Sequence, residues 1–161
     1  MNDSLDFLEN ITYEELTEGD TATFTRTLTE DELVLFAIVS GDVNPVHLDP
    51  ELAADSLFKG RIAHGMWSGS LISAALATVM PGPGTIYLEQ SLKFTKPVRL
   101  DDTLTVFLTI VGKEPRNRVK VGCEVKNQNG ELVVVGEAKV IAPKQKLSLP
   151  RPLLPKITLK D

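Results

Sequence analysis

The chain has two histidines, His47 and His64, and a short loop joins the first of them to Asp42. Pro45 lies within that loop, and its fixed φ narrows the conformations available between Asp42 and His47. An imidazole with an ordinary pKa of about 6.5 beside a carboxylate can hold one water from two directions and move a proton near neutral pH. The spacing therefore predicts a site for general acid–base chemistry.

A structural interpretation of the same residues stays open. Asp42 can bond backbone amides in an Asx-turn, Asp49 can cap the helix that Pro50 begins, and His64 can hold a turn by a hydrogen bond. Four groups (Asp42, His47, Asp49 and His64) could in principle gather a metal ion. Two of them have capping or turn explanations, and no ligand pair has helical spacing, so we expect no metal.

The residues after His64 form a site of partial positive charge. Gly65 opens the run Met66–Met80, which carries no charge, and the amides at the start of such a helix favour an oxyanion. A glycine here lets a substrate carbonyl approach the backbone closely, or it serves a bend that tolerates no side chain. The sequence alone leaves both explanations standing.

Three serines on this helix are the remaining polar candidates: Ser68, Ser70 and Ser73. Most helical serines return a hydrogen bond to the backbone, and only one on the side that faces the loop could reach a substrate. Residues 65–69 place serine fourth, which departs from the G-x-S-x-G elbow of serine hydrolases. We therefore expect no nucleophilic serine.

Helices must position these groups. Thr29 and Glu32 have capping-box spacing before a helix that Gly41 ends, and Asp49-Pro50 begins a short helix over Glu51 to about Leu57. The run over residues 66–80 is apolar or small on every side, which predicts a helix that is buried nearly all round. Residues 81–84, Pro-Gly-Pro-Gly, end it.

The other regular segments are β-branched and predict strands. They are residues 21–28, 86–93, 103–111, 119–126 and 132–141. Asn129-Gly130 joins the last two as a hairpin, so neighbouring strands run antiparallel. The predicted fold class is α+β, with one central helix wrapped by a curved antiparallel sheet of about five strands.

Composition limits the classes of partner. The chain has 161 residues, 42% hydrophobic and 24% charged, which predicts one globular domain. A net charge of −5 argues against nucleic acid and anionic membranes as partners. The single cysteine, Cys123, forms no internal bridge, and the first twenty residues show no signal-peptide pattern. The cytoplasm is the expected compartment, and no segment is long enough to span a bilayer.

The end of the chain differs in composition from the rest. Four of the ten prolines fall within residues 143–161, where basic residues also outnumber acidic ones. We predict a domain over residues 1–142, with its core at about 12–142, and a stiff basic tail or linker over residues 143–161. Removal of that tail is expected to leave folding and activity nearly unchanged.

One part of the sequence resembles a known family. Residues 40–50 (Ser-Gly-Asp-Val-Asn-Pro-Val-His-Leu-Asp-Pro) and 63–66 (Ala-His-Gly-Met) are similar to the hydratase-2 motif of MaoC-like (R)-specific enoyl-CoA hydratases. The likeness continues through residues 81–88 and 94–98 to about Ile141. It implies the hot-dog fold, in which a sheet wraps a central helix.

The resemblance also implies an activity and its residues. The catalytic pair falls on Asp42 and His47, the oxyanion-hole glycine on Gly65 and the helix serine on Ser73. The implied reaction is reversible syn hydration of trans-2-enoyl-CoA to (R)-3-hydroxyacyl-CoA, with short acyl chains favoured and no cofactor beyond the CoA thioester substrate. The resemblance further implies a homodimer joined edge to edge. The chain also resembles the hydratase-like N-terminal region of fused enoyl-CoA hydratase/phosphate acetyltransferase proteins, which allows a phosphate acyltransferase domain, fused or separate, as a partner.

Other functions share this fold. A hot-dog thioesterase or an acyl-carrier-protein dehydratase would act on similar thioesters, although the loop of residues 42–47 argues against both. A non-catalytic module that binds acyl-CoA or dimerises for a fused transferase is the third alternative.

Overall fold

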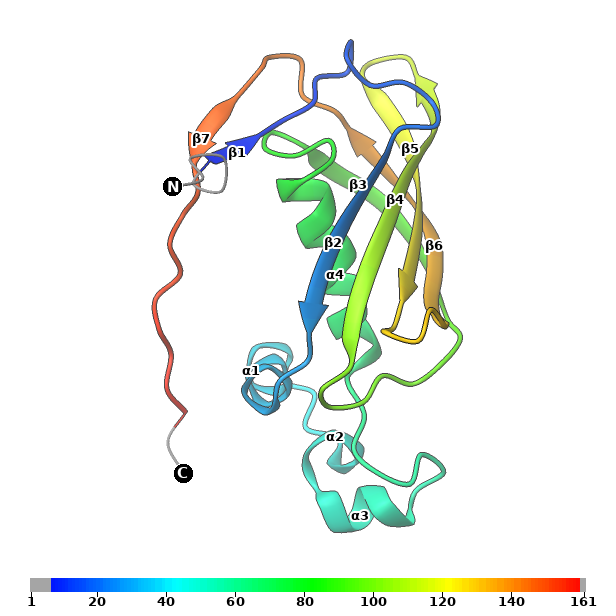
Figure 1. The fold of residues 1–161 in the computed structure, drawn as a ribbon, viewed down its shortest axis with the longest axis vertical. Helices are drawn as coiled ribbons and strands as arrows, with labels where there is room; N and C mark the ends of the chain where they lie inside the picture. The colour runs from blue at the N-terminus through cyan, green and yellow to red at the C-terminus, as the bar shows by residue number, and fades with distance from the viewer. Residues whose placement is uncertain (1–6, 160–161) are drawn as a thin grey trace.

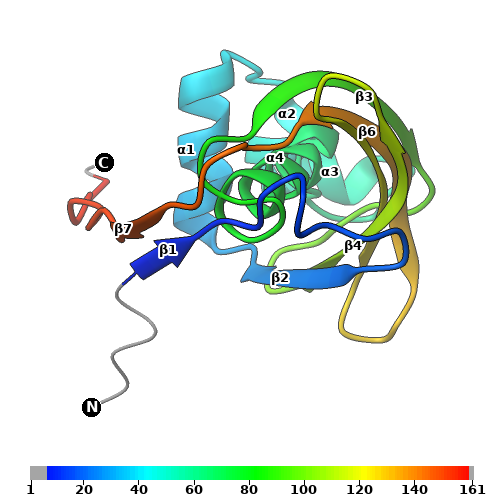
Figure 2. The same cartoon turned by 90° about the horizontal axis from the view of Figure 1, so that it is seen from above.

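The computed structural model describes residues 7–159, and a long helix, α4 (Gly65–Thr78), lies at its centre (Figures 1 and 2). A curved sheet wraps this helix in the order β2-β4-β5-β6-β3, with every neighbouring pair antiparallel. The strands are β2 (Thr21–Thr27), β3 (Ile86–Phe94), β4 (Thr103–Glu114), β5 (Arg118–Lys126) and β6 (Leu132–Ile141). The predicted α+β class, the five strands and the hairpin at Asn129-Gly130 are confirmed.

Alternation along the strands builds the core. Every second residue of β4 from Leu104 to Ile110 is buried, and these side chains belong to one cluster with Ile72, Ala75 and Leu76 of α4. Burying a side chain such as leucine or valine contributes about 1.5–3 kcal/mol. The sheet therefore holds α4 in place along the helix's inner face.

Helix α4 is open along one face, so the expectation that it is buried nearly all round was wrong. Met66, Ser70 and Ala77 are exposed and Ser73 is half-buried, so these residues form one open stripe. Their spacing of three and four residues puts them on one face of the helix. The sheet curves around only part of the helix, which leaves this uncharged face uncovered.

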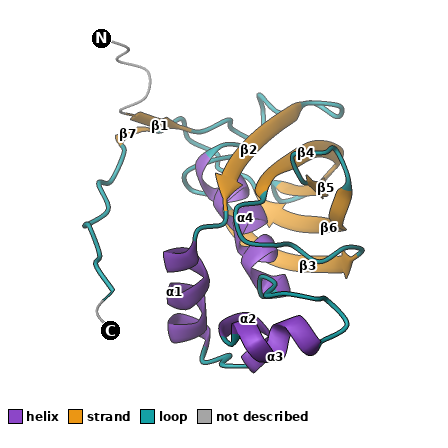
Figure 3. Ribbon diagram, turned by 60° about the horizontal axis from the view of Figure 1, so that its bottom comes forward, coloured by secondary structure: helices purple, strands orange, loops and turns teal. Residues whose placement is uncertain are grey.

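Three short helices lie together at one end of the molecule (Figure 3). They are α1 (Glu30–Ser40), α2 (Pro45–Leu48) and α3 (Pro50–Asp55). Thr29 caps α1 as predicted, but the Glu32 carboxylate accepts from Arg26 Nε at 2.7 Å rather than reaching back to the cap. Gly41 ends α1 with φ of 74°, a left-handed conformation that glycine adopts at little cost.

The segment between α1 and α3 is more ordered than a loop. Asn44 accepts from the Val46 amide at 3.2 Å and Pro45 takes the first position of α2, so His47 lies on one helical turn. Asp49 caps α3 as predicted, because its Oδ1 accepts from the amides of Glu51 and Leu52 at 2.9 and 3.0 Å. Capping at both ends keeps this segment rigid.

A second, two-stranded sheet was not predicted. β1 (Phe7–Glu9) pairs antiparallel with β7 (Ser148–Pro150) (Figure 1). This pairing joins the start of the described chain to a segment near its end. Asn10 is 1% exposed and its Nδ2 donates to the carbonyls of Pro83 and Gln145 at 3.1 and 2.9 Å. The first part of the expected tail is therefore bonded to the body, which argues against a passive linker over residues 143–150.

The boundary at residue 142 stays a prediction, and residues 1–6 and 160–161 of the predicted segments lie outside the described residues. Between residues 7 and 159, no helix combines the length and apolar character needed to cross a membrane.

Candidate active site

Asp42 and His47 face each other across a short gap. His47 Nε2 lies 3.9 Å from Asp42 Oδ2, and the His47 side chain is 9% exposed whereas that of Asp42 is 52% exposed. The other carboxylate oxygen, Oδ1, accepts from the Asn44 amide at 3.2 Å in an Asx-turn. The structural interpretation of Asp42 is confirmed at Oδ1, while Oδ2 stays available for the predicted catalytic role. The gap suits a water that bonds to both groups.

A backbone carbonyl determines the tautomer of His47. Its Nδ1 lies 2.8 Å from the carbonyl oxygen of Ile62, and a carbonyl can only accept, so Nδ1 carries the proton. In the neutral ring Nε2 then holds a free lone pair, and this is the nitrogen that faces Asp42. Ile62 thus points the basic atom of His47 at the gap.

His64 supports both members of the pair. Its ring stacks on the His47 ring with centroids 3.8 Å apart, and its Nε2 lies 2.9 Å from the carbonyl oxygen of Asp42. Because a carbonyl oxygen can only accept, Nε2 of His64 is the protonated nitrogen. Nδ1 is buried without a hydrogen-bond partner among the described residues. The expected role of His64 in holding a turn is consistent with the bond to Asp42, and the stacking adds a contact to His47.

Gly65 begins α4 beside a cavity of about 320 Å³. His64, the N-cap of the helix, makes no side-chain hydrogen bond to the first turn. A methyl group at Gly65 would come within 3.1 Å of the Phe94 ring, and the glycine has no positive φ to accommodate. A side chain at this position is therefore disfavoured by the close contact with Phe94 and not by a bend. The start of the helix offers a donor for an anionic oxygen at the cavity wall.

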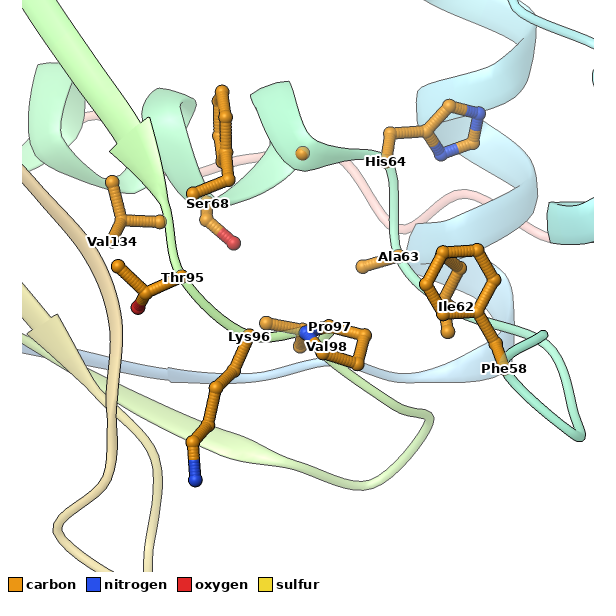
Figure 4. A pocket seen from close by; sticks show the side chains of 12 residues that line it. Phe58, Ile62, Ala63, His64, Ser68, Thr95, Lys96, Pro97, Val98 and Val134 are labelled. Carbon is orange, nitrogen blue, oxygen red and sulfur yellow. The ribbon is translucent and has the colours of Figure 1, made fainter.

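The serines of α4 differ in where they point. The Ser68 hydroxyl is directed into the cavity between Thr95, Val134 and Ala63 (Figure 4), and the residue is 1% exposed. Ser70 instead returns a bond to the Trp67 carbonyl at 2.6 Å, as most helical serines do.

Ser73 is placed elsewhere on the helix. It lies eight residues beyond Gly65, about 12 Å along the axis, and does not line this cavity. Its role stays a prediction. Ser68 was one of the three serine candidates, and its spacing of three from Gly65 puts both residues on one helix face.

The three side chains near the gap could also hold a metal ion. Asp42, His47 and His64 each offer one ligand atom, and these atoms lie within 4.8 Å of one another. Stacked imidazoles direct their lone pairs side by side rather than toward one point, which suits a tetrahedral ion poorly. The expectation of no metal stays a prediction.

An ion pair fixes the loop that carries Ile62. Both guanidinium nitrogens of Arg61 donate to the Glu30 carboxylate, at 2.6 and 2.7 Å. This hydrogen bonding lowers the pKa of Glu30 and raises that of Arg61. The pair ties the start of α1 to the residue next to Ile62, and so helps to hold the carbonyl that orients His47.

The comparison with protein families decides the class. The model of the MaoC-like domain matches residues 14–131. The chain belongs to this family. A curated relative from Rhodospirillum rubrum named (R)-specific enoyl-CoA hydratase is 43% identical over 131 residues, which cover 81% of this chain and 91% of the relative. A 3-hydroxybutyryl-CoA dehydratase from Methylorubrum extorquens is 39% identical, covering 83% of this chain and 85% of the relative.

Solved structures agree with the family. The unliganded R-hydratase PhaJ1 from Pseudomonas aeruginosa is 55% identical, with a TM-score of 0.93 over 96% of this chain and 99% of that one. The hot-dog fold is thereby confirmed for this MaoC-like protein, and the family and its named relatives make it an enzyme of the hydro-lyase class.

Proposed function

We propose that this MaoC-like protein is an (R)-specific enoyl-CoA hydratase, which adds water reversibly to trans-2-enoyl-CoA and gives (R)-3-hydroxyacyl-CoA. The observation that carries the proposal is the 3.9 Å gap between His47 Nε2 and Asp42 Oδ2, with the tautomer of His47 set by Ile62. The names of relatives that are 43% and 39% identical support it.

The proposed reaction needs no covalent intermediate. A water held by Asp42 and His47 gives a proton to His47 Nε2 while its oxygen bonds to C3 of the enoyl thioester. The electron pair of the double bond moves toward the thioester oxygen, whose charge the Gly65 amide meets, an interaction typically worth about 3–4 kcal/mol. A proton then returns from the pair to C2 on the same face. Asp42 and His47 act on the same water, so the pair together supplies the base and the acid of the reaction.

Hydration of crotonyl-CoA, followed as loss of the enoyl absorbance, tests the proposal. Asp42→Asn and His47→Ala should each lower kcat at least ~10²-fold, and the double variant should be little worse than either single one because both groups act on one water. Ser73→Ala should be milder. Asp31→Asn, an exposed acid on α1, is the matched control and should leave kcat unchanged. Full activity in both single variants would favour a binding module instead.

Product and carrier separate this proposal from its alternatives. Stereospecific dehydrogenases should find the (R)-3-hydroxy thioester, and formation of the (S) product would contradict the proposed geometry. Free acid and CoA as products would indicate a thioesterase. A higher kcat/KM with acyl-carrier-protein thioesters than with CoA thioesters would indicate a dehydratase of that class.

We also propose that the reaction needs no metal or cofactor. Water activation by the Asp42–His47 pair requires no Lewis acid. Dialysis against EDTA should therefore leave kcat with crotonyl-CoA unchanged. Loss of activity that Zn²⁺ restores would instead assign Asp42, His47 and His64 as ligands.

The proposed assembly is a homodimer in the cytoplasm. Within the described residues β3 pairs on one side only, with β6, so its other edge is free to pair with a second copy. Sedimentation should show a dimer at assay concentration, and a monomer with full turnover would contradict it. A phosphate acyltransferase, fused or separate, stays a prediction.

A further inference from the structure

Two glycines on α4 leave room for side chains from strand β3. A methyl group at Gly65 would lie 3.1, 3.3 and 3.4 Å from three ring carbons of Phe94, and one at Gly69 would lie 3.1 Å from Leu92 Cδ1. The glycines are four residues apart in a helix, and Phe94 and Leu92 are two apart in a strand, so each pair shares one face of its element. The helix therefore meets β3 at two successive contacts of the same kind.

The two contacts differ in what surrounds them. Leu92 packs against the core cluster of the described residues, whereas Phe94 does not belong to that cluster, is 49% exposed and lines the cavity beside Gly65. An aromatic ring that is half exposed gains only part of the free energy that burial offers. Core packing therefore explains Leu92 but does not explain Phe94.

The start of α4 needs support from outside the helix. His64, the N-cap, makes no side-chain hydrogen bond to the first turn among the described residues, and the first helical residue is Gly65. Glycine is the least favourable helix residue apart from proline, and a helix end without a capping side chain frays readily. The position of the first turn therefore depends on contacts with the rest of the molecule.

Strand β3 holds Phe94 firmly on the other side of this contact. Phe94 pairs with Val134 in the register of β3 and β6, and the next residue, Thr95, donates its amide to the Val133 carbonyl at 2.9 Å. The Thr95 hydroxyl also donates to the Leu132 carbonyl at 2.6 Å. The ring is therefore attached to a well-bonded part of the sheet.

We propose that Phe94 is a positioning residue for the reaction. Its ring holds the first turn of α4 so that the Gly65 amide points to the place where the thioester oxygen binds. A donor to such an oxygen must lie at about 2.7–3.1 Å, and a misplacement of about 1 Å can cost a factor of about 10² in rate. The inference rests on the proposed hydratase reaction and adds a residue of β3 to it.

Matched alanine variants test the proposal by hydration of crotonyl-CoA. Phe94→Ala should lower kcat at least ~10-fold and change KM less than ~2-fold, because charge on the thioester oxygen develops only in the transition state. Phe94→Leu keeps part of the contact and should recover part of kcat. Leu92→Ala removes the equivalent contact one helical turn further on and should leave kcat within ~2-fold.

Thermal melts separate positioning from stability. Leu92 packs against the core, so Leu92→Ala should lower the melting temperature more than Phe94→Ala does. The variant with the smaller loss of stability should therefore show the larger loss of kcat. If Leu92→Ala does not fold, Leu92→Val replaces it with the same expectation for kcat. Unchanged kcat in Phe94→Ala, or equal losses of kcat at both positions, would overturn the proposal.

A double variant tests the contact itself. Gly65→Ala places a methyl group against the Phe94 ring, which should displace the first turn and lower kcat. Phe94→Leu in the same chain relieves this clash, so the double variant should be more active than Gly65→Ala alone. Losses that multiply would show that the two residues act independently, which contradicts the proposal.

Hydrogen exchange measures the first turn without turnover. The Trp67 amide donates to the His64 carbonyl at 3.0 Å in this turn, and the Val79 amide donates to the Ala75 carbonyl at 2.9 Å at the other end of α4. Phe94→Ala should raise the exchange rate of the Trp67 amide at least ~5-fold relative to that of Val79. An unchanged ratio of the two rates would show that the ring does not hold the turn.

The two kinds of measurement distinguish this inference from the proposed function. Hydration by the wild-type protein, with kcat and the exchange ratio unchanged in Phe94→Ala, removes only the positioning role. Faster exchange at Trp67 in a protein that hydrates no enoyl thioester leaves Phe94 as the residue that holds the first turn and removes only the hydratase.

Discussion

His64 occupies a position where a histidine is costly. It is 3% exposed and its Nδ1 has no hydrogen-bond partner among the described residues, so this nitrogen is desolvated without compensation. A phenylalanine would fill much of the same space without that cost. The bond from Nε2 to the Asp42 carbonyl and the contact with His47 offer a reason for the histidine that packing does not.

His64→Phe should therefore separate activity from stability. A neutral hydrogen bond contributes about 0.5–1.5 kcal/mol, so loss of the bond to Asp42 should lower kcat roughly 2- to 10-fold with KM little changed. The melting temperature should stay within a few degrees, since the orphaned nitrogen disappears too. His64→Gln keeps an N–H donor and should recover part of kcat. Equal kcat in all three proteins would make His64 purely structural.

The candidate site could be predicted only where side-chain chemistry is local in sequence. Asp42 and His47 were found because Pro45 lies between them in one loop. The carbonyl of Ile62, which sets the tautomer of His47, could not be predicted, because any residue type carries a backbone carbonyl. The contact between Gly65 and Phe94 joins a helix to a strand, and a single sequence carries no signal for such a pair.

Helix α1 and the loop before α4 depend on one ion pair, Arg61–Glu30, which responds to pH. The pKa of Glu30 is below its usual 4.5 in the folded chain, so the unfolded chain binds the proton more tightly. The stabilisation is fully present above about pH 4.5 and is lost as the pH falls through the lowered pKa.

Glu30→Gln should consequently matter at pH 7 and not at pH 3. Exposed pairs contribute up to about 1 kcal/mol, and the Glu30 side chain is 58% exposed, so a loss of about 0.5 kcal/mol in the free energy of unfolding is expected at pH 7. Urea unfolding at both pH values measures it. Glu18→Gln, at an exposed acid with no ion pair to other described residues, is the control. A difference that persists at pH 3 would contradict this account.

Strands and helices were predictable in proportion to their length. Buried and more exposed residues alternate over residues 103–110 of β4 and over all nine residues of β5, which is enough for the period of two to be recognised. α2 has four residues and β1 and β7 have three each, too few for any period. β1 and β7 also depend on each other across almost the entire chain, so neither segment alone indicates a strand.

Asn10 connects three distant parts of the molecule. Its side chain bonds to Pro83 and Gln145 and accepts from the Leu147 amide at 2.9 Å, while a methyl group at Gly82 would meet the Glu9 carbonyl at 2.9 Å. The N-terminal segment, the turn after α4 and residues 143–150 are thus joined at one buried amide. These bonds predict that residues 143–150 unfold together with the body.

Asn10→Ala should lower the melting temperature by roughly 3–10 °C. Loss of the side chain leaves two carbonyls and one amide without partners, which lowers the free energy of unfolding by about 1–3 kcal/mol in all. A change of 1 kcal/mol shifts the melting temperature of a chain of this size by about 2–4 °C. Removal of residues 143–161 should have at least as large an effect. Thermal melts at a fixed protein concentration measure both. Unchanged melting in the truncated chain would restore the tail to a passive linker.

The pairing of Phe7 with Pro150 also sets an order of events during synthesis. Translation produces β1 before the five-stranded sheet and its partner strand β7 after that sheet. The five-stranded sheet is complete at Ile141, so the body can fold around α4 while β1 still lacks its partner. Until β7 leaves the ribosome, β1 is an unpaired strand edge, open to chaperones and to neighbouring nascent chains.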